Sequence, residues 1–247
     1  MRRFGARDLA VRSKIDATPV TETDEAVEEF IRTELARARP HDAVVGEEGG
    51  VTGSGTRRWI IDPIDGTKSF VKGAPPWATL IGLQECVPDA GNNARRDNAA
   101  ILVGVVSAPA LGRRWWAARG TGAFVNSTPM HVSAVARLDE ALLCHADVLS
   151  YGRLGMGDEF ASLAERVWDR RGFGDFWGHM LVAEGVADVM VEPDVSLWDV
   201  AALFPIVEEA GGRLTDRRGV ATPDGGNAVT TNGVLHEGVL TIVGTRA

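Results

Sequence analysis

The apolar positions of the first half of the chain predict one helix and then a series of strands. Between Thr21 and Pro40 the apolar side chains keep helical spacing, and Thr21 is the expected N-cap because acids follow it in the first turn. The apolar members of that helix are Val27, Phe30, Ile31, Leu35 and Ala38. Strand-like apolar runs then occupy 43–45, 59–61, 77–87, 99–107, 114–118 and 123–125.

Two polar tracts interrupt these runs. Residues 49–56 are rich in Gly, Ser and Thr and predict a mobile loop, and residues 88–98 predict a long exposed hairpin connection. Residues 1–130 are therefore expected to form an α+β half, in which a helix precedes a mainly antiparallel sheet.

The second half, residues 131–247, alternates between strands and helices and predicts an α/β half. The expected strands are 142–145, 187–191 and 228–230, and the expected helices are 159–168, 179–186 and 196–210. Residues 234–243 complete this half. Pro205 should kink or loosen the last helix, because proline deletes a backbone hydrogen bond. The two halves are expected to form a single domain over residues 1–247.

Composition excludes several classes of protein. The 247 residues are 45% hydrophobic and 24% charged, which is ordinary for a globular chain with a real core. The formal charge of −8 argues against a nucleic-acid protein and against adhesion to anionic membranes. It does not oppose an anionic substrate, because bound divalent cations would invert the local field.

Nothing in the sequence predicts secretion or membrane insertion. No stretch approaches the ~20 continuous apolar residues of a membrane span. The first residues lack the apolar segment of a signal peptide, so a cytoplasmic protein is expected. Cys86 and Cys144 lie in apolar surroundings and are expected to be buried free thiols.

The most informative stretch is residues 58–70, where the apolar run Trp59–Ile61 meets two acids, Asp62 and Asp65. Pro63 fixes the backbone between the acids, and Gly66-Thr67 follows, so backbone N–H groups could face an anion. The pattern suggests a carboxylate-held metal site beside a phosphate pocket. The alternative is a simple turn after a strand.

Two further acidic positions are ambiguous when each is considered alone. Asp199 stands three residues after Ser196, the spacing of a capping box, so it would lie in the first turn of a helix as a metal ligand or merely as a cap. Glu47, in Gly46-Glu47-Glu48, would be either a ligand or a solvated loop acid.

Together these motifs, in this order and spacing, resemble the inositol monophosphatase family over nearly the whole chain. The resemblance implies a layered α-β-α-β-α sugar-phosphatase fold and a Mg²⁺-dependent, lithium-sensitive phosphomonoesterase. Within the family the chain looks most like the histidinol-phosphatase branch, on the evidence of residues 62–73, 77–80, 174–177, 181–185 and 192–199. Inositol phosphatases more often have Thr-Asn where this chain has Lys68-Ser69. Family members usually begin with a longer N-terminal helix, and this chain starts near the end of that helix.

The resemblance also assigns roles to individual residues. The implied metal ligands are Glu47, Asp62, Asp65, Asp199 and the Ile64 carbonyl, which would hold two or three Mg²⁺ ions, with Mn²⁺ as the alternative. All these donors are oxygens, which suit such hard cations and argue against zinc. As a hypothesis, Glu47 and Thr67 hold the attacking water and Asp24 supports Thr67.

Substrate contacts are implied at eight positions: Glu47, Ile64, Asp65, Gly66, Thr67, Asp175, Glu192 and Asp199. The Gly66 and Thr67 amides would hold the phosphoryl oxygens. Asp175 and Glu192 would face the leaving group, where two acids suit the cationic amino group of histidinol phosphate. Asp175 is otherwise a surface loop acid. Lys68 is expected to be exposed, and His179 is expected to be structural.

The leading hypothesis is therefore hydrolysis of L-histidinol phosphate in histidine biosynthesis by a homodimer. The first alternative is the same chemistry on inositol 1-phosphate or another small sugar phosphate. The alternative from a different class is a non-catalytic cation-binding domain, against which the Glu47–Thr67 pair argues, because a structural ion needs no hydroxyl to position water.

Overall fold

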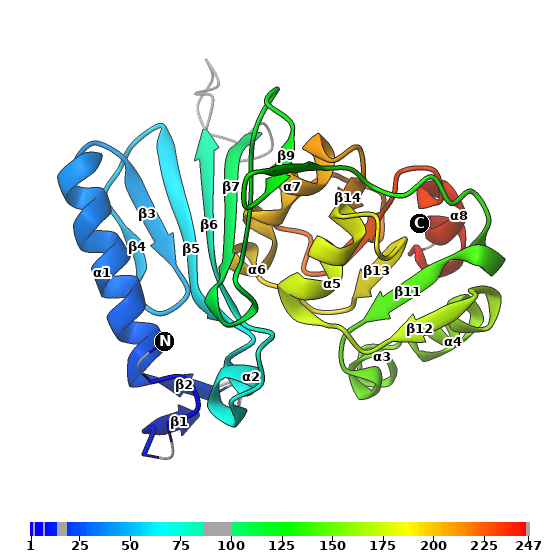
Figure 1. The fold of residues 1–247 in the computed structure, drawn as a ribbon, viewed down its shortest axis with the longest axis horizontal. Coiled ribbons are helices and arrows are strands. Elements are labelled where there is room, and N and C mark those ends of the chain that lie inside the picture. Colours follow the sequence, from blue (N-terminus) through cyan, green and yellow to red (C-terminus); the bar gives the residue numbers. More distant parts are fainter. Residues whose placement is uncertain (2, 7, 14–18, 86–99, 246–247) are drawn as a thin grey trace.

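The computed structural model describes residues 1, 3–6, 8–13, 19–85 and 100–245, and these residues form five alternating layers (Figure 1). Helix α1 covers the outer face of a large sheet, three helices lie between that sheet and a smaller one, and further helices cover the far side of the smaller sheet. The predicted α-β-α-β-α architecture is confirmed. The expected hairpin over 88–98 and Cys86 lie outside the described residues.

The large sheet has eight strands, and all neighbouring pairs are antiparallel except β3 and β5, which run parallel. The mainly antiparallel sheet expected in the first half is thus confirmed. Its strands, in spatial order, are β10 (Thr128–Met130), β9 (Ala123–Val125), β8 (Arg113–Ala118), β7 (Ala100–Ala108), β6 (Ala78–Glu85), β5 (Arg57–Asp65), β3 (Ala43–Gly46) and β4 (Gly50–Thr52).

The smaller sheet has five strands and belongs to the second half of the chain. Its first three strands are parallel and its last two join antiparallel. In spatial order they are β12 (Asp169–Arg171), β11 (Leu142–His145), β13 (Val189–Glu192), β15 (Ala228–Thr231) and β14 (Arg213–Thr215). A separate two-stranded ribbon pairs β1 (Val11–Ser13) with β2 (Pro19–Thr21).

The helices take their positions from the apolar faces that they bury. The outer helix is α1 (Glu22–Ala38), and the short α2 (Thr67–Lys72) follows β5. The middle layer holds α5 (Asp175–Ala183), α6 (Leu197–Ala201) and α7 (Leu203–Glu209). The last layer holds α3 (Val148–Arg153), α4 (Gly157–Arg166) and α8 (His236–Val243). Single 3₁₀ turns occur at Pro109–Leu111 and Leu138–Glu140.

The main apolar core lies between the large sheet and the middle helices. It joins Trp115 of β8 to Phe176 of α5 and to Leu203 of α7, all fully buried. The junction of α6 and α7 packs so closely on β7 that a Cβ at Gly104 would lie 2.0 Å from the Ala202 carbonyl oxygen. Glycine at 104 therefore allows the approach that fixes α6, and with it Asp199, against the sheet.

Pro205 divides the helix expected over 196–210. The structure has α6 and α7 with a break at Ala202. Proline at 205 has no N–H to donate to the carbonyl of Ala201, the residue four positions before it, so a continuous helix would lose that bond. The expected kink is confirmed, and α6 is left as a five-residue helix.

Three other expectations need correction. The tract 49–56 is not only loop, because β4 pairs with β3 at the edge of the large sheet. The helix expected at 179 begins four residues earlier, at Asp175, behind a Gly174 that reads as a loop in the sequence. In α1, Phe30 is 67% exposed, and the buried residues are Asp24 and Glu28 rather than apolar ones.

The helices and the cysteine of the described residues bear on two expectations from the sequence, membrane insertion and free thiols. Within this part of the chain, none of the helices combines the length and the apolar character needed to cross a bilayer. Cys144 is a buried free thiol, and burial raises its pKa to about 12. A thiol with that pKa stays protonated near neutral pH and is a poor nucleophile.

Candidate metal centre

A bulge at the end of β5 brings Asp62 and Asp65 to the same side of the sheet. The strand expected over residues 59–61 is longer at both ends and continues to Asp65. Asp62 pairs with Leu80 of β6 and Asp65 with Ala78, so β5 advances three residues while its partner advances two. In a regular strand, residues three apart point to opposite faces, and the extra residue of a bulge reverses this. Pro63 is tolerated at this irregularity, where a ladder hydrogen bond is already missing.

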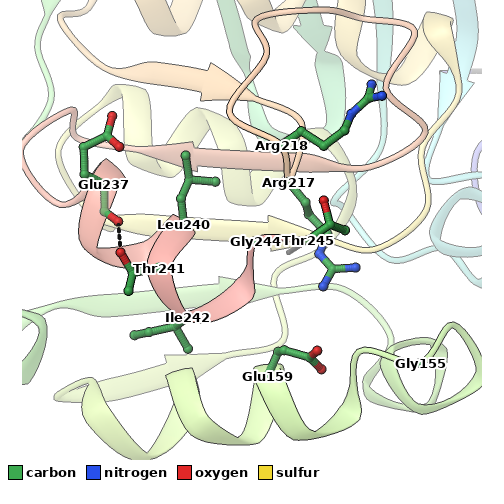
Figure 2. A pocket seen from close by; sticks show the side chains of 10 residues that line it. All are labelled: Gly155, Glu159, Arg217, Arg218, Glu237, Leu240, Thr241, Ile242, Gly244 and Thr245. Carbon is green, nitrogen blue, oxygen red and sulfur yellow. Dashed lines mark hydrogen bonds between the residues drawn. The ribbon is translucent and has the colours of Figure 1, made fainter. Parts of the chain in front are cut away.

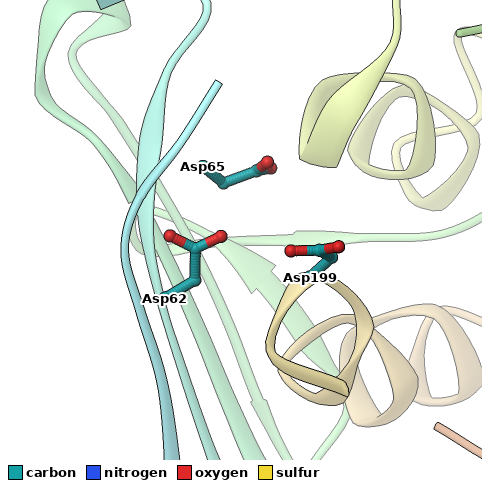
Figure 3. A group of neighbouring side chains, drawn as sticks. All are labelled: Asp62, Asp65 and Asp199. Atoms are coloured by element: carbon teal, nitrogen blue, oxygen red, sulfur yellow. The ribbon is translucent and has the colours of Figure 1, made fainter. Parts of the chain in front are cut away.

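The third acid comes from the N-terminus of α6, which faces β5 (Figure 3). The predicted capping box is present, and the Ser196 N–H donates to Asp199 Oδ2 at 2.7 Å. One carboxylate oxygen from each of Asp62, Asp65 and Asp199 lies within 4.8 Å of the others. Residues 137 positions apart in the sequence (199 − 62) thus form one cluster of oxygens.

The three carboxylates repel one another in a poorly hydrated place. The pKa of Asp62 lies well above its usual range because of burial, with further increases from Asp65, Glu47 and Asp199. The pKa of Asp65 is raised in the same way, first by burial and then by Asp175 and Asp199. Burial also raises the pKa of Asp199, to about 7, although the Ser196 N–H opposes this.

The donor set fits a divalent cation. Asp62 Oδ1 is buried without a hydrogen-bond partner, which is expensive for a carboxylate oxygen unless something else binds it. Among the ion pairs of the described residues, none includes Asp62, Asp65 or Asp199. An oxygen-only cluster of carboxylates suits Mg²⁺, Mn²⁺ or Ca²⁺ rather than zinc.

Glu47 reaches the same cavity from the end of β3, where its N–H donates to the Ile61 carbonyl at 3.1 Å. The loop behind it is held by Glu28, a buried acid of α1. Glu28 accepts from the Glu48 N–H and the Gly49 N–H, each at 2.8 Å. Arg32, one turn further along α1, donates to Glu28 at 2.7 Å. Sequence reasoning missed Glu28, although it stands one turn after Asp24.

Thr67 lies where its hydroxyl meets two acceptors. Its Oγ1 is 2.9 Å from the Ile64 carbonyl oxygen and 3.3 Å from Asp24 Oδ1. Asp24 is fully buried and also accepts from the Thr21 N–H at 2.9 Å, so the cap of α1 fixes it. Burial raises the pKa of Asp24. The structure therefore brings the predicted pair Asp24 and Thr67 together across 43 residues.

Gly66 and Asp175 pack against each other at the next corner of the cavity. Gly66 has a φ of 79°, and a Cβ there would lie 3.0 Å from the Pro76 carbonyl oxygen and 3.3 Å from Asp175 Oδ2. Asp175 itself has a φ of 55°, which is rare for a residue with a side chain and is common at functional sites. The next amide, of Phe176, donates to Asp65 Oδ2 at 2.7 Å.

Asp175 is exposed at the start of α5, as part of the cavity wall rather than of a remote loop. Although the residue as a whole is exposed, protein atoms around its carboxyl group reduce the hydration of that group, which raises its pKa to about 6, and the charge of Glu192 adds to this. Lys68 is exposed, as expected, and also borders the cavity.

The cavity has a volume of about 490 Å³. The side chains that border it include one acid that sequence reasoning missed, Asp194, which is exposed two residues after Glu192. The whole lining is Pro19, Glu47, Asp62, Ile64, Asp65, Gly66, Thr67, Lys68, Asp175, Asp194, Val195, Ser196, Trp198 and Asp199.

Glu192 differs from the other predicted site residues, because it does not line the cavity. It is 8% exposed and lies close enough to affect the pKa of Asp175, Asp65 and Asp199. The fully buried His179 is its hydrogen-bond partner, with Nε2 at 3.0 Å from Glu192 Oε2.

A larger hollow of about 830 Å³ shares no residue with the acid-lined cavity (Figure 2). It lies between α4 and α8, and its two arginines are already engaged. Arg217 donates to the Val243 carbonyl at 2.6 Å, and Arg218 pairs with Asp216. This hollow contains no carboxylate cluster of the kind formed by Asp62, Asp65 and Asp199.

Comparisons with known proteins agree on one family. A histidinol-phosphatase of Mycobacterium tuberculosis is 52% identical over 245 residues, covering 97% of this chain and 90% of the relative. A histidinol-phosphatase of Streptomyces coelicolor is 49% identical and covers 97% and 89%. Among solved structures, a Thermotoga maritima IMPase superposes with a TM-score of 0.85 at 31% identity, covering 98% of this chain and 90% of that one.

The profile of the inositol monophosphatase family matches residues 1–246. That match spans both sheets and every acid of the cavity described above. The chain therefore belongs to the inositol monophosphatase family.

Proposed function

We propose that this protein is a Mg²⁺-dependent phosphatase that hydrolyses L-histidinol phosphate to L-histidinol and phosphate in histidine biosynthesis. Its family and its relatives make it a phosphoric monoester hydrolase. The observation that carries the proposal is the cluster of Asp62, Asp65 and Asp199 in a chain about half identical to two histidinol-phosphatases over nearly its full length.

The carboxylate cluster supports the dependence on a divalent cation. Glu47, Asp62, Asp65 and Asp199, with the Ile64 carbonyl, are the groups that would hold two or three ions. When bound, Mg²⁺ supplies positive charge for the phosphate oxygens and makes a nearby water more acidic. The orphaned Asp62 Oδ1 and the raised pKa values of the acids support this, because both are relieved by a cation.

Glu47 and Thr67 would position the attacking water. The Thr67 hydroxyl proton has two acceptors nearby, Ile64 O and Asp24 Oδ1, so an oxygen lone pair of Thr67 remains to accept a hydrogen bond from water. Glu47 would accept the second water proton. Asp24 would act through Thr67 by fixing its rotamer, and the Gly66 and Thr67 amides would hold the phosphoryl oxygens.

The leaving-group end of the cavity supports a cationic alcohol. Asp175 and Asp194 border the cavity together with Lys68, and the charge of Glu192 acts on Asp175 although Glu192 does not line the cavity. With a pKa of about 6, Asp175 is mostly ionised at neutral pH in the absence of ligand. An ammonium group on the leaving alcohol would be attracted to these acids, whereas inositol carries no charge with which to use them.

A phosphate-release assay on metal-stripped protein tests the proposal. The substrates would be L-histidinol phosphate, inositol 1-phosphate and a sugar phosphate at matched concentrations, each with no metal, Mg²⁺ or Mn²⁺. We expect the highest kcat/KM for histidinol phosphate with Mg²⁺. A higher kcat/KM for inositol 1-phosphate would favour the first alternative, and no turnover of any ester with Mg²⁺ would favour a non-catalytic cation-binding domain.

Three further expectations rest on the family resemblance and stay predictions. They are inhibition by lithium, assembly as a homodimer and a cytoplasmic location. Lithium titration of the same assay and sedimentation of the purified protein test the first two directly.

A further inference from the structure

The buried histidine of α5 is a polar group near the cavity that the proposed chemistry does not use. His179 is fully buried, and both ring nitrogens are engaged. Nδ1 lies 2.7 Å from Thr230 Oγ1 on β15, and Nε2 lies 3.0 Å from Glu192 Oε2 on β13. The three side chains form a continuous chain from the interior of the smaller sheet to the acid that lies behind the cavity wall.

For a neutral imidazole beside an ionised carboxylate, the direction of both hydrogen bonds follows from the donor and acceptor capacity of each group. An ionised Glu192 only accepts, so Nε2 carries the proton and donates to it. Nδ1 of the neutral ring then accepts from the Thr230 hydroxyl. Glu192 is only 8% exposed, and His179 is its hydrogen-bond partner among the described residues.

Through Glu192, this chain of hydrogen bonds is linked electrostatically to Asp175 in the cavity wall. Glu192 is hydrogen-bonded to His179, which belongs to the same helix as Asp175, and among the charged neighbours of Asp175 it has the largest effect on the pKa of that acid. His179 stands four residues after Asp175 in α5, in the buried part of that helix. The bond from Oε2 to the imidazole holds the Glu192 side chain in place, so its negative charge acts on the cavity from a fixed position.

We infer that His179 is a positioning residue that fixes Glu192 as a second negative charge behind Asp175, and that this pair selects phosphomonoesters whose alcohol carries an ammonium group. The inference rests on the proposed function. It assigns to His179 and Thr230, neither of which lines the cavity, a part in substrate choice. The selection acts on binding of the leaving group and not on the water or the phosphorus.

Two variants of His179 separate this role from simple packing. His179→Gln can place an amide N–H near the position of Nε2 and keep the bond to Glu192, whereas His179→Asn reaches only the position of Nδ1 and loses it. The matched control is His236→Asn. His236 is also fully buried, and its two ring nitrogens each lie 3.0 Å from a threonine hydroxyl, on Thr215 and Thr231, with no acid involved.

The assay compares histidinol phosphate with 3-(imidazol-4-yl)propyl phosphate, the same ester without its amino group. We expect His179→Asn to raise KM for histidinol phosphate about tenfold while KM for the deaminated ester changes less than about twofold. His179→Gln should keep the wild-type ratio of the two KM values, and His236→Asn should keep it whatever its effect on thermal stability. If His179→Asn does not fold, Glu192→Gln should likewise raise KM for histidinol phosphate relative to KM for the deaminated ester.

Each outcome decides one proposal. Equal KM changes on both esters, an unchanged ratio in His179→Asn, or the same loss in His179→Gln would overturn the role of His179. If the wild type releases phosphate from other esters but not from histidinol phosphate, the proposed substrate is wrong and the inference falls with it. If the wild type prefers histidinol phosphate and only the variants deviate from expectation, the proposed function stands and the inference alone fails.

Discussion

The crowded acids of the metal centre should make the metal-free protein less stable at neutral pH, and Asp199→Asn should relieve this. The pKa of Asp199 rises from 3.8 to about 7 in the folded protein, first through burial and then through Glu192, Glu47 and Asp175. Asparagine has nearly the same shape and keeps an oxygen for the Ser196 N–H, so the cap of α6 is preserved.

The sign and size of the expected change in the free energy of unfolding follow from the linkage between proton binding and folding. Between pH 3.8 and about 7 the folded state keeps a proton on Asp199 that the unfolded state has lost, so the free energy of unfolding falls as pH rises. Each pKa unit corresponds to about 1.4 kcal/mol, so a shift of about three units destabilises the metal-free protein by up to about 4 kcal/mol above pH 7. For a chain of this size that is on the order of 10 °C in Tm.

The assay is urea denaturation of protein stripped with a chelator, at intervals from about pH 4.5 to about pH 8. Asp199→Asn should be more stable than the wild type at the upper end and should lose that advantage toward the lower end. Added Mg²⁺ should stabilise the wild type much more than the variant. Asp194→Asn, which removes an exposed acid of the same cavity, is the control and should have little effect. An advantage of Asp199→Asn that is constant with pH, or absent, would refute the reasoning.

Three other changes have distinct expected results. Asp65→Asn should abolish phosphate release and leave the far-UV circular dichroism unchanged; an active, Mg²⁺-dependent variant would show that Asp65 is not a ligand. Glu28→Gln weakens the charge-assisted hydrogen bonds from the Glu48 and Gly49 amides, so it should lower the free energy of unfolding by about 2 kcal/mol. It should also weaken Mg²⁺ binding measured by calorimetry. The control Glu29→Gln changes an exposed neighbour and should have neither effect. KM for histidinol phosphate should rise as pH falls through about 6, the pKa of Asp175, because the protonated acid no longer attracts the ammonium group; a KM that is flat with pH would exclude that role.

Apolar patterning predicted the larger elements because burial decides them. Strands such as β7 and β11 are runs of apolar side chains, and α1 begins at a threonine with acids behind it. Three-residue strands such as β12, Asp169–Arg171, contain too few side chains to show a period, and two of its three residues are exposed. Their pairing depends on neighbours that are distant in the sequence.

The inner face of α1 shows why the apolar pattern did not predict which residues of this helix are buried. Asp24, Glu28 and Arg32 recur at intervals of four, so they share one face of the helix. That face meets Thr67 and the loop after Glu47, which need hydrogen-bond acceptors rather than packing. Phe30 points away and is exposed. The spacing of the charged residues contained this information, but their partners lie in other segments of the chain.

Prolines accompany the two backbone irregularities beside the converging acids, and sequence alone did not reach the bulge of β5. Pro63 lies in the bulge of β5, without which Asp62 and Asp65 would point to opposite faces of the sheet. Pro205 accompanies the break that leaves α6 short, with Asp199 in its first turn facing that bulge. The bulge of β5 and the break between α6 and α7 both interrupt regular backbone hydrogen bonding close to the acids. The backbone of β5 and α6 therefore sets the direction of the acids, and the cost of holding the acids together appears as their raised pKa values.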